Sequence, residues 1–117
     1  MYLINTSLKN IKAITLLLIC FISFNASAND VPDFLETKGY AEQGHASEQL
    51  NLALMYDKGQ GVIQSSKNSY IWNTIAAANG HENAIYNRDL VAKNLSPRGL
   101  EEAQKEAAKL YEKINNK

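Results

Sequence analysis

The chain has 117 residues, and its 12 lysine and arginine side chains balance its 12 aspartate and glutamate side chains. A chain of this length is enough for one small domain, and without a basic excess it is not expected to bind nucleic acid or anionic lipid. It contains one cysteine, so no disulfide can form within the chain.

The first 28 residues are typical of a secretory signal peptide. Lys9 and Lys12 form a positive leading region, and residues 13–24 form an apolar run that is too short to span a bilayer as a helix. The small residues at 26–28 form a cleavage site after Ala28, which predicts a mature chain of residues 29–117. We therefore expect a periplasmic or secreted protein without a stable membrane anchor. An uncleaved anchor is the alternative.

Hydrophobic periodicity predicts five helices and no strand in the mature chain. Gly59 can take the left-handed backbone that ends a helix, and Ser65 or Ser66 can cap the helix that follows. Ser96-Pro97 is typical of a helix start, because a capping hydroxyl precedes a proline at the first helical position. The predicted helices span residues 34–44, 47–58, 66–80 and 81–94, and the last begins at Pro97.

Apolar spacing also predicts which side of each helix is buried. The helix over 81–94 is expected to turn four apolar side chains inward: Ala84, Ile85, Leu90 and Val91. The last helix carries an apolar stripe: Leu100, Ala103, Ala107, Leu110, Tyr111 and Ile114. Its other face is charged: Glu101, Glu102, Lys105, Glu106, Lys109 and Lys113. This pattern predicts a lid, with its apolar stripe on the core and its charges in water.

A dipeptide recurs at a fixed interval. Gly44-His45 precedes the helix over 47–58, and Gly80-His81 follows the next helix, 36 residues later. An interval of this length is typical of helical repeats, whose stacked helix pairs usually serve as binding surfaces.

The residues between these dipeptides follow a known order of aliphatic, aromatic, glycine and alanine positions: Leu52, Met55, Tyr56, Gly59, Gly61, Val62, Trp72, Ala76, Ala77 and Gly80. This order resembles the Sel1-like repeat family, which is related to tetratricopeptide helix pairs. Three positions depart from the family pattern, because Glu48, Ala53 and Ser69 replace the usual Ala, Gly and Ala. The resemblance implies an all-α fold, an antiparallel helix-pair α-solenoid of about two repeats with capping helices. The best repeat spans 44–80, and closing helices span 81–117.

The residues give little support for a catalytic site or a metal site. His45 and Glu48 lie three positions apart, but a zinc site needs three or four ligands, and the mature chain offers two histidines and no thiol. The glycines of segment 57–61 follow a helix, whereas phosphate-binding loops open one. We predict no metal, no cofactor and no enzymatic activity, with a cell-wall-active enzyme as the alternative.

The resemblance implies a protein–protein interaction module or adaptor. Tyr56 and Trp72 match core positions of the family, so we expect both to be buried. The residues expected to contact a protein partner are Asn51, Tyr70, Asn73, Tyr86 and Asn87. An immunity-type protein that neutralises an envelope-targeting toxin is an alternative function, and a homodimer through the open edge is an alternative assembly. Because arrays usually need three repeats for stability, a decayed paralogue is a further alternative.

Overall fold

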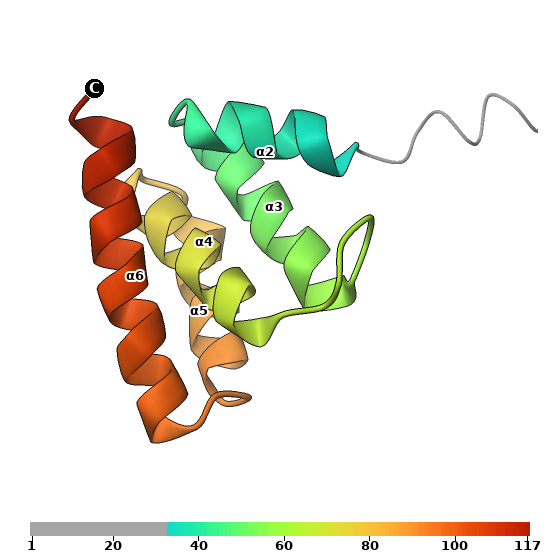
Figure 1. Cartoon of the computed structure of the whole chain (residues 1–117), viewed down its shortest axis with the longest axis vertical. Coiled ribbons are helices and arrows are strands. Elements are labelled where there is room, and N and C mark those ends of the chain that lie inside the picture. Colours follow the sequence, from blue (N-terminus) through green and yellow to red (C-terminus); the bar gives the residue numbers. More distant parts are fainter. Residues whose placement is uncertain (1–32) are drawn as a thin grey trace, which may run out of the picture. The chain divides into compact units, whose positions relative to one another are not determined.

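A computed structural model describes residues 33–117, and every regular element in this part of the chain is an α-helix. The predicted signal peptide, residues 1–28, lies outside the described residues. The helices are α2 (Phe34–Glu42), α3 (Ala46–Lys58), α4 (Ser66–Ala78), α5 (Glu82–Ala92) and α6 (Pro97–Asn115) (Figure 1). The predicted all-α class is confirmed, and the predicted helix bounds agree to within two residues. None of the helices in residues 33–117 combines the length and hydropathy that a membrane span requires.

Local signals fix the ends of the central helices. α3 ends at Gly59, whose φ of 67° is the predicted left-handed conformation. The Ser65 hydroxyl caps α4 by accepting a hydrogen bond of 3.1 Å from the backbone N–H of Asn68. The Ser96 hydroxyl caps α6 by accepting one of 3.0 Å from the N–H of Gly99, with proline in the first turn as predicted. Each hydroxyl satisfies an N–H that the helix itself cannot pair.

Two helix–helix turns that lie 36 residues apart share one backbone geometry. Gly44 and Gly80 both adopt positive φ, at 98° and 96°, a backbone conformation that residues other than glycine rarely adopt. In each turn the N–H of the following histidine donates to the carbonyl five residues earlier, over 3.3 Å for His45 and 2.9 Å for His81. Each histidine is extended and precedes the next helix. The α2–α3 and α4–α5 connections are therefore the same turn made twice.

Helix α4 lies at the centre of the packing. It packs against α3, α5 and α6, while α2 packs against α3 (Figure 1). Trp72 is 5% exposed and Ile75 is fully buried, so the predicted burial of Trp72 is confirmed. Tyr56 is partly buried against the same core. The other helices contribute mainly small and aliphatic side chains: Ala41, Leu52, Ala53, Val91, Ala103, Ala107 and Ile114.

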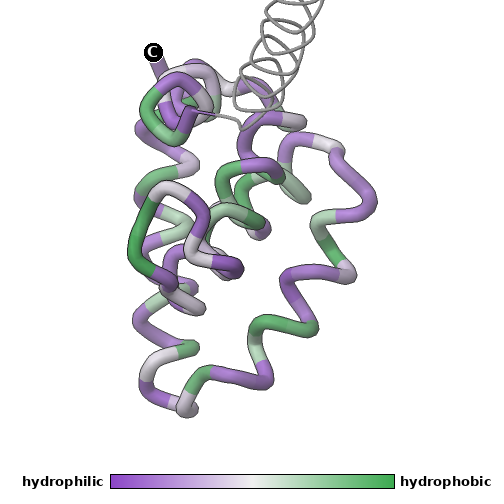
Figure 2. The backbone as a smooth tube through the Cα atoms, turned by 90° about the vertical axis from the view of Figure 1, so that its right-hand side faces the viewer, coloured by the Kyte–Doolittle hydropathy of each residue, from purple (hydrophilic) through white to green (hydrophobic). Residues whose placement is uncertain are grey.

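Helix α6 carries apolar side chains on one side and charged side chains on the other. Figure 2 shows how apolar and polar residues alternate along the described helices. The buried residues of α6 are Ala103, Ala107 and Ile114, and Leu110 is partly buried against the same core. It packs on α4, whereas its packing on α5 is slight. The predicted apolar stripe is therefore largely the surface with which α6 covers α4, but Tyr111 is 36% exposed and departs from the prediction.

Helix α5 departs from its predicted packing. Ala84 and Val91 are buried as expected, but Ile85 is 46% exposed and Leu90 is 42% exposed. Residues seven apart point the same way on a helix, and α5 packs mainly along α4, so Ala84 and Val91 mark the covered stripe. Ile85 and Leu90 lie to either side of it. Their predicted inward orientation is wrong, because one neighbouring helix covers only a narrow part of the surface.

A buried glutamine joins three helices. Gln49 of α3 is fully buried. Its Nε2 donates to the carbonyl of Ala41 in α2 over 3.0 Å, and its Oε1 accepts from Nδ2 of Asn79, the residue that follows α4, over 2.9 Å. A buried amide that is satisfied on both sides fixes the relative position of the groups it bonds.

Candidate functional site: a groove between two helices

A groove of about 340 Å³ runs between α4 and α6. Ile71 and Trp72 of α4 form its floor together with the half-buried Leu110 of α6. Polar side chains line its edges: Asn68, Glu106, Lys109 and Lys113. We call the site defined by these seven residues the α4–α6 groove.

The sequence of α6 places the lining residues in a row beside its buried stripe. Ala103 and Ala107 are 0% and 1% exposed where α6 meets α4, and small side chains at such a contact let two helices approach closely. Glu106, Leu110 and Lys113 follow at steps of four and three, so they share one side of the helix next to these alanines. The α6 edge of the groove is therefore continuous along the helix.

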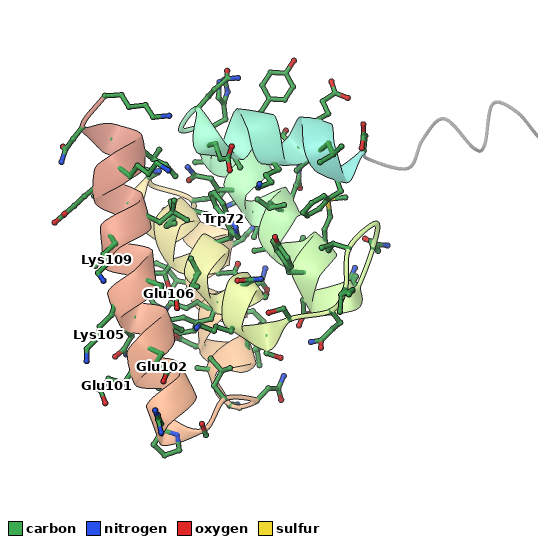
Figure 3. The ribbon with its side chains drawn as sticks, viewed as in Figure 1. Trp72, Glu101, Glu102, Lys105, Glu106 and Lys109 are labelled. Atoms are coloured by element: carbon green, nitrogen blue, oxygen red, sulfur yellow. The ribbon has the colours of Figure 1, made fainter. Side chains whose placement is uncertain are left out.

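One part of the α6 edge is neutralised by an ion pair. Nζ of Lys67, in the first turn of α4, lies 2.6 Å from Oε1 of Glu106 and 3.9 Å from Oε2 of Glu102. Figure 3 shows both glutamates on the side of α6 that faces α4. The hydrogen bond with Glu106 raises the pKa of Lys67 above its ordinary value, and attraction to both carboxylates adds to this against the opposing effect of lost hydration. Glu106 therefore brings little free negative charge to the groove.

Farther along α6 the edge carries lysines without counter-charges. Lys109 and Lys113 lie on α6, Lys117 lies just beyond its last residue, and none of the three forms an ion pair with another residue of the described 33–117 segment. Lys109 and Lys113 line the α4–α6 groove, and Lys113 and Lys117 also line a smaller hollow of about 100 Å³ beside Glu42. We call these three residues the lysine row.

A second hollow lies on the other side of the α4–α6 contact. It has a volume of about 280 Å³, and its lining residues are uncharged: Thr74, Ile75, Ala78, Gln104, Ala107, Ala108 and Tyr111. Because none of its lining residues is charged, it has no means to select a partner by charge.

Two of the predicted partner contacts are buried. Tyr70 is 7% exposed and Asn73 is 1% exposed, because α3, α5 and α6 cover α4 from three directions. Nδ2 of Asn73 faces Oγ of Ser69 at 3.4 Å, and its Oδ1 has no hydrogen-bond partner within the described residues. The predicted exposure of Tyr70 and Asn73 is therefore wrong.

The other predicted contacts lie at the surface on two helices. Asn51 of α3 is exposed, and its Nδ2 donates to Oε2 of Glu48 over 3.3 Å. On α5, Tyr86 is 68% exposed and Asn87 is half-buried. None of these three lines the α4–α6 groove. They stay predicted contacts on a different surface.

Periodicity alone places Lys109 and Lys113 on a solvated face and misses the groove. The lysines that recur at 105, 109, 113 and 117 are the sequence signal that points to this part of α6. Like charges four residues apart destabilise a helix by about 0.2–0.5 kcal/mol per pair, but Glu106 and Glu112 lie three residues to either side of Lys109 and offset this cost. Lys105 pairs with Glu101 at 2.9 Å, and Figure 3 shows both on the side of α6 away from α4.

The described residues contain no cluster of side chains that could bind a metal ion. Across residues 33–117, no group of three or more His, Cys, Asp or Glu side chains is placed to hold an ion. His45 is exposed and Glu48 is half-buried, and the latter accepts a hydrogen bond from Asn51.

Membership of a repeat family stays a prediction from the residues, because no family model, no curated protein and no solved structure matches the chain.

Proposed function

We propose that the mature chain is an exported, non-catalytic module that binds another protein. The α4–α6 groove carries this proposal, because it joins an apolar floor at Trp72 to a polar edge between two helices. Protein interfaces combine an apolar centre with a polar rim in this way, and aromatic side chains at the centre supply much of the binding energy.

A short helical repeat is the architecture that we propose for this module. The turns at Gly44 and Gly80 support it, since they share φ and hydrogen bonding at an interval of 36 residues. Each joins two helices that pack on each other, α2 with α3 and α4 with α5. An antiparallel helix-pair solenoid of about two repeats would have this period, and α6 would then act as the polar-backed cap that such arrays need.

Site-specific photocrosslinking in the cells that make the protein tests the proposed function. A photoreactive amino acid replaces Asn68 or Lys109 in the groove, Asn51 or Tyr86 on the other surface, or Lys58 as an exposed control. We expect one discrete adduct from both groove positions, with its protein partner identified by mass spectrometry. Adducts from Asn51 and Tyr86 alone would move the binding site to the exposed sides of α3 and α5. No adduct from any position of a folded protein would contradict a binding function.

Export is a separate part of the proposal and rests on residues 1–28. We expect protein isolated from the cell envelope or the medium to begin at Asn29, as found by N-terminal sequencing. A chain that retains Met1 and sediments with membranes would show instead that the leader is an uncleaved anchor.

A further inference from the structure

The edge of the α4–α6 groove is basic although the mature chain is not. Residues 29–117 contain 10 lysine and arginine side chains against 12 aspartate and glutamate side chains. Five of the basic side chains form ion pairs: Lys38, Lys67, Arg88, Arg98 and Lys105. The lysine row has no such partner among residues 33–117, so positive charge gathers along one edge of an apolar groove on a slightly acidic protein.

The needs of α6 itself do not account for the lysine row. A cation in the last turn of a helix is stabilised by the helix dipole, which explains Lys113. Lys109 lies outside that turn, and although Glu106 and Glu112 lie three residues to either side of it, neither forms an ion pair with it in the described segment. The nearby Glu106 is already held by Lys67 at 2.6 Å. The row is therefore a charge pattern that an external carboxylate partner would complete.

We propose that the α4–α6 groove binds an acidic amphipathic helix of the protein partner. This inference rests on the proposed function and names the chemistry of the partner. Apolar side chains of the bound helix would lie over Ile71, Trp72 and Leu110, and its carboxylates would meet the lysine row.

Helix geometry explains why the occupant is a helix. Four residues of an α-helix rise by about 6 Å, so glutamates at four-residue steps on a partner helix running alongside α6 stay in register with Lys109 and Lys113, the two lysines of the row that lie on α6. Amphipathic helices commonly bind in hydrophobic grooves, into which they insert apolar residues at spacings of three, four and seven. Glu42 lines the smaller hollow with Lys113 and Lys117 and would repel a continuous polyanion, so nucleic acid and anionic lipid fit this edge less well.

The test uses two synthetic helical peptides and the protein purified from cells that export it. Both peptides share the same leucine positions and contain no aromatic residue, and their polar positions beside the leucines are all glutamate in one and all lysine in the other. Trp72 is the only tryptophan in the chain, so its fluorescence reports directly on the floor of the groove. We expect the glutamate peptide to change this emission and to bind at least about tenfold more tightly than the lysine peptide. Its affinity should fall as salt is added.

A charge-reversed pair of variants locates the binding. In Lys109→Glu/Lys113→Glu the glutamate peptide should bind about tenfold or more weakly, and the lysine peptide should gain affinity. The matched control Lys58→Glu/Lys93→Glu changes the charge equally, at two exposed lysines without ion pairs in the described segment. It should bind the glutamate peptide within about twofold of the original protein. Circular dichroism melts establish that both variants fold.

Each opposite result has a distinct meaning. Equal binding of the two peptides, or equal loss in both variants, overturns the acidic preference but leaves the proposed function standing. Tighter binding of heparin or of vesicles rich in phosphatidylserine than of the glutamate peptide shows a polyanion site and overturns the inference. If neither peptide binds while groove positions still crosslink a protein, the helical occupant is wrong. If crosslinks also fail, the proposed function itself is wrong.

Discussion

Single residues decide how firmly α2, α3 and α4 are held together. Gln49 is fully buried yet bonds to a carbonyl of α2 and to the Asn79 amide beyond α4. Glycines at 44 and 80 let the chain turn twice in the same way. Each of these residues therefore influences the position of a whole helix.

Replacing Gln49 with leucine should lower the free energy of unfolding by about 1–3 kcal/mol, because the buried carbonyl of Ala41 loses its donor and the partly buried Asn79 amide loses its acceptor. Urea unfolding followed by Trp72 fluorescence measures the change. Gln104→Leu is the control, since Gln104 is exposed on α6, and it should stay within about 0.5 kcal/mol of the original protein. Equal effects of the two substitutions would show that the buried hydrogen bonds contribute nothing specific.

Gly80→Ala should destabilise the protein by about 1–2 kcal/mol, because a Cβ is strained at its φ of 96° although no atom lies within 4 Å of it. Gly39→Ala should instead stabilise the protein. Gly39 lies inside α2 with open space around it, and alanine is favoured there by about 0.5–1 kcal/mol. Thermal melts of the two variants show which one gains and which one loses stability, and stabilisation by Gly80→Ala would mean that a Cβ is not strained at this position.

At the scale of elements, the sequence predicts helix ends better than helix neighbours. Ser65, Ser96 and Gly59 act through bonds to residues three or four positions away, so their effect is local and readable. Ile85 and Leu90 are exposed because only α4 covers α5, and periodicity contains no information on how many helices surround another. The packing of α6 on α4 is likewise tertiary, which is why periodicity alone misses the groove between them.

The contact of α6 with α4 can be tested at two adjacent alanines. Ala107 is 1% exposed at that contact, and Ala107→Glu would bury a charge without a partner. We expect a loss of about 3 kcal/mol or more in the free energy of unfolding. Ala108→Glu places the same side chain on an exposed position one residue along and should change it by about 0.5 kcal/mol at most. Similar urea midpoints for the two variants would show that α6 is not docked as described.

The Lys67–Glu106 pair links the same two helices and gives a pH signature. Because the hydrogen bond with Glu106 raises the pKa of Lys67, its contribution to stability is complete below the ordinary lysine pKa and is lost as pH rises through the raised value. Lys67→Gln should therefore lower the urea midpoint at about pH 8 and approach the original protein at about pH 11. Lys58→Gln, at a lysine without an ion pair in residues 33–117, should show no such convergence.

At the scale of the molecule, α4 packs against three of the other described helices, and this explains why two predicted contact residues are buried. A helix with three neighbours has little free surface, so Tyr70 and Asn73 are buried although their types suggest contact residues. Asn51 and Tyr86 lie on helices with fewer neighbours and are exposed. The sequence identifies polar and aromatic candidates, but which of them reach water depends on how the helices surround α4.

The central place of α4 predicts that the described helices unfold together. Arrays with fewer than three repeats are usually unstable, and a decayed paralogue would melt without cooperativity. Here, separating α3, α5 or α6 from α4 exposes its core side chains, which should make unfolding all-or-none. We expect urea midpoints from Trp72 fluorescence and from far-ultraviolet circular dichroism to coincide. Helical signal that persists after the Trp72 emission has shifted would contradict this, and a midpoint that rises with protein concentration would indicate the homodimer instead.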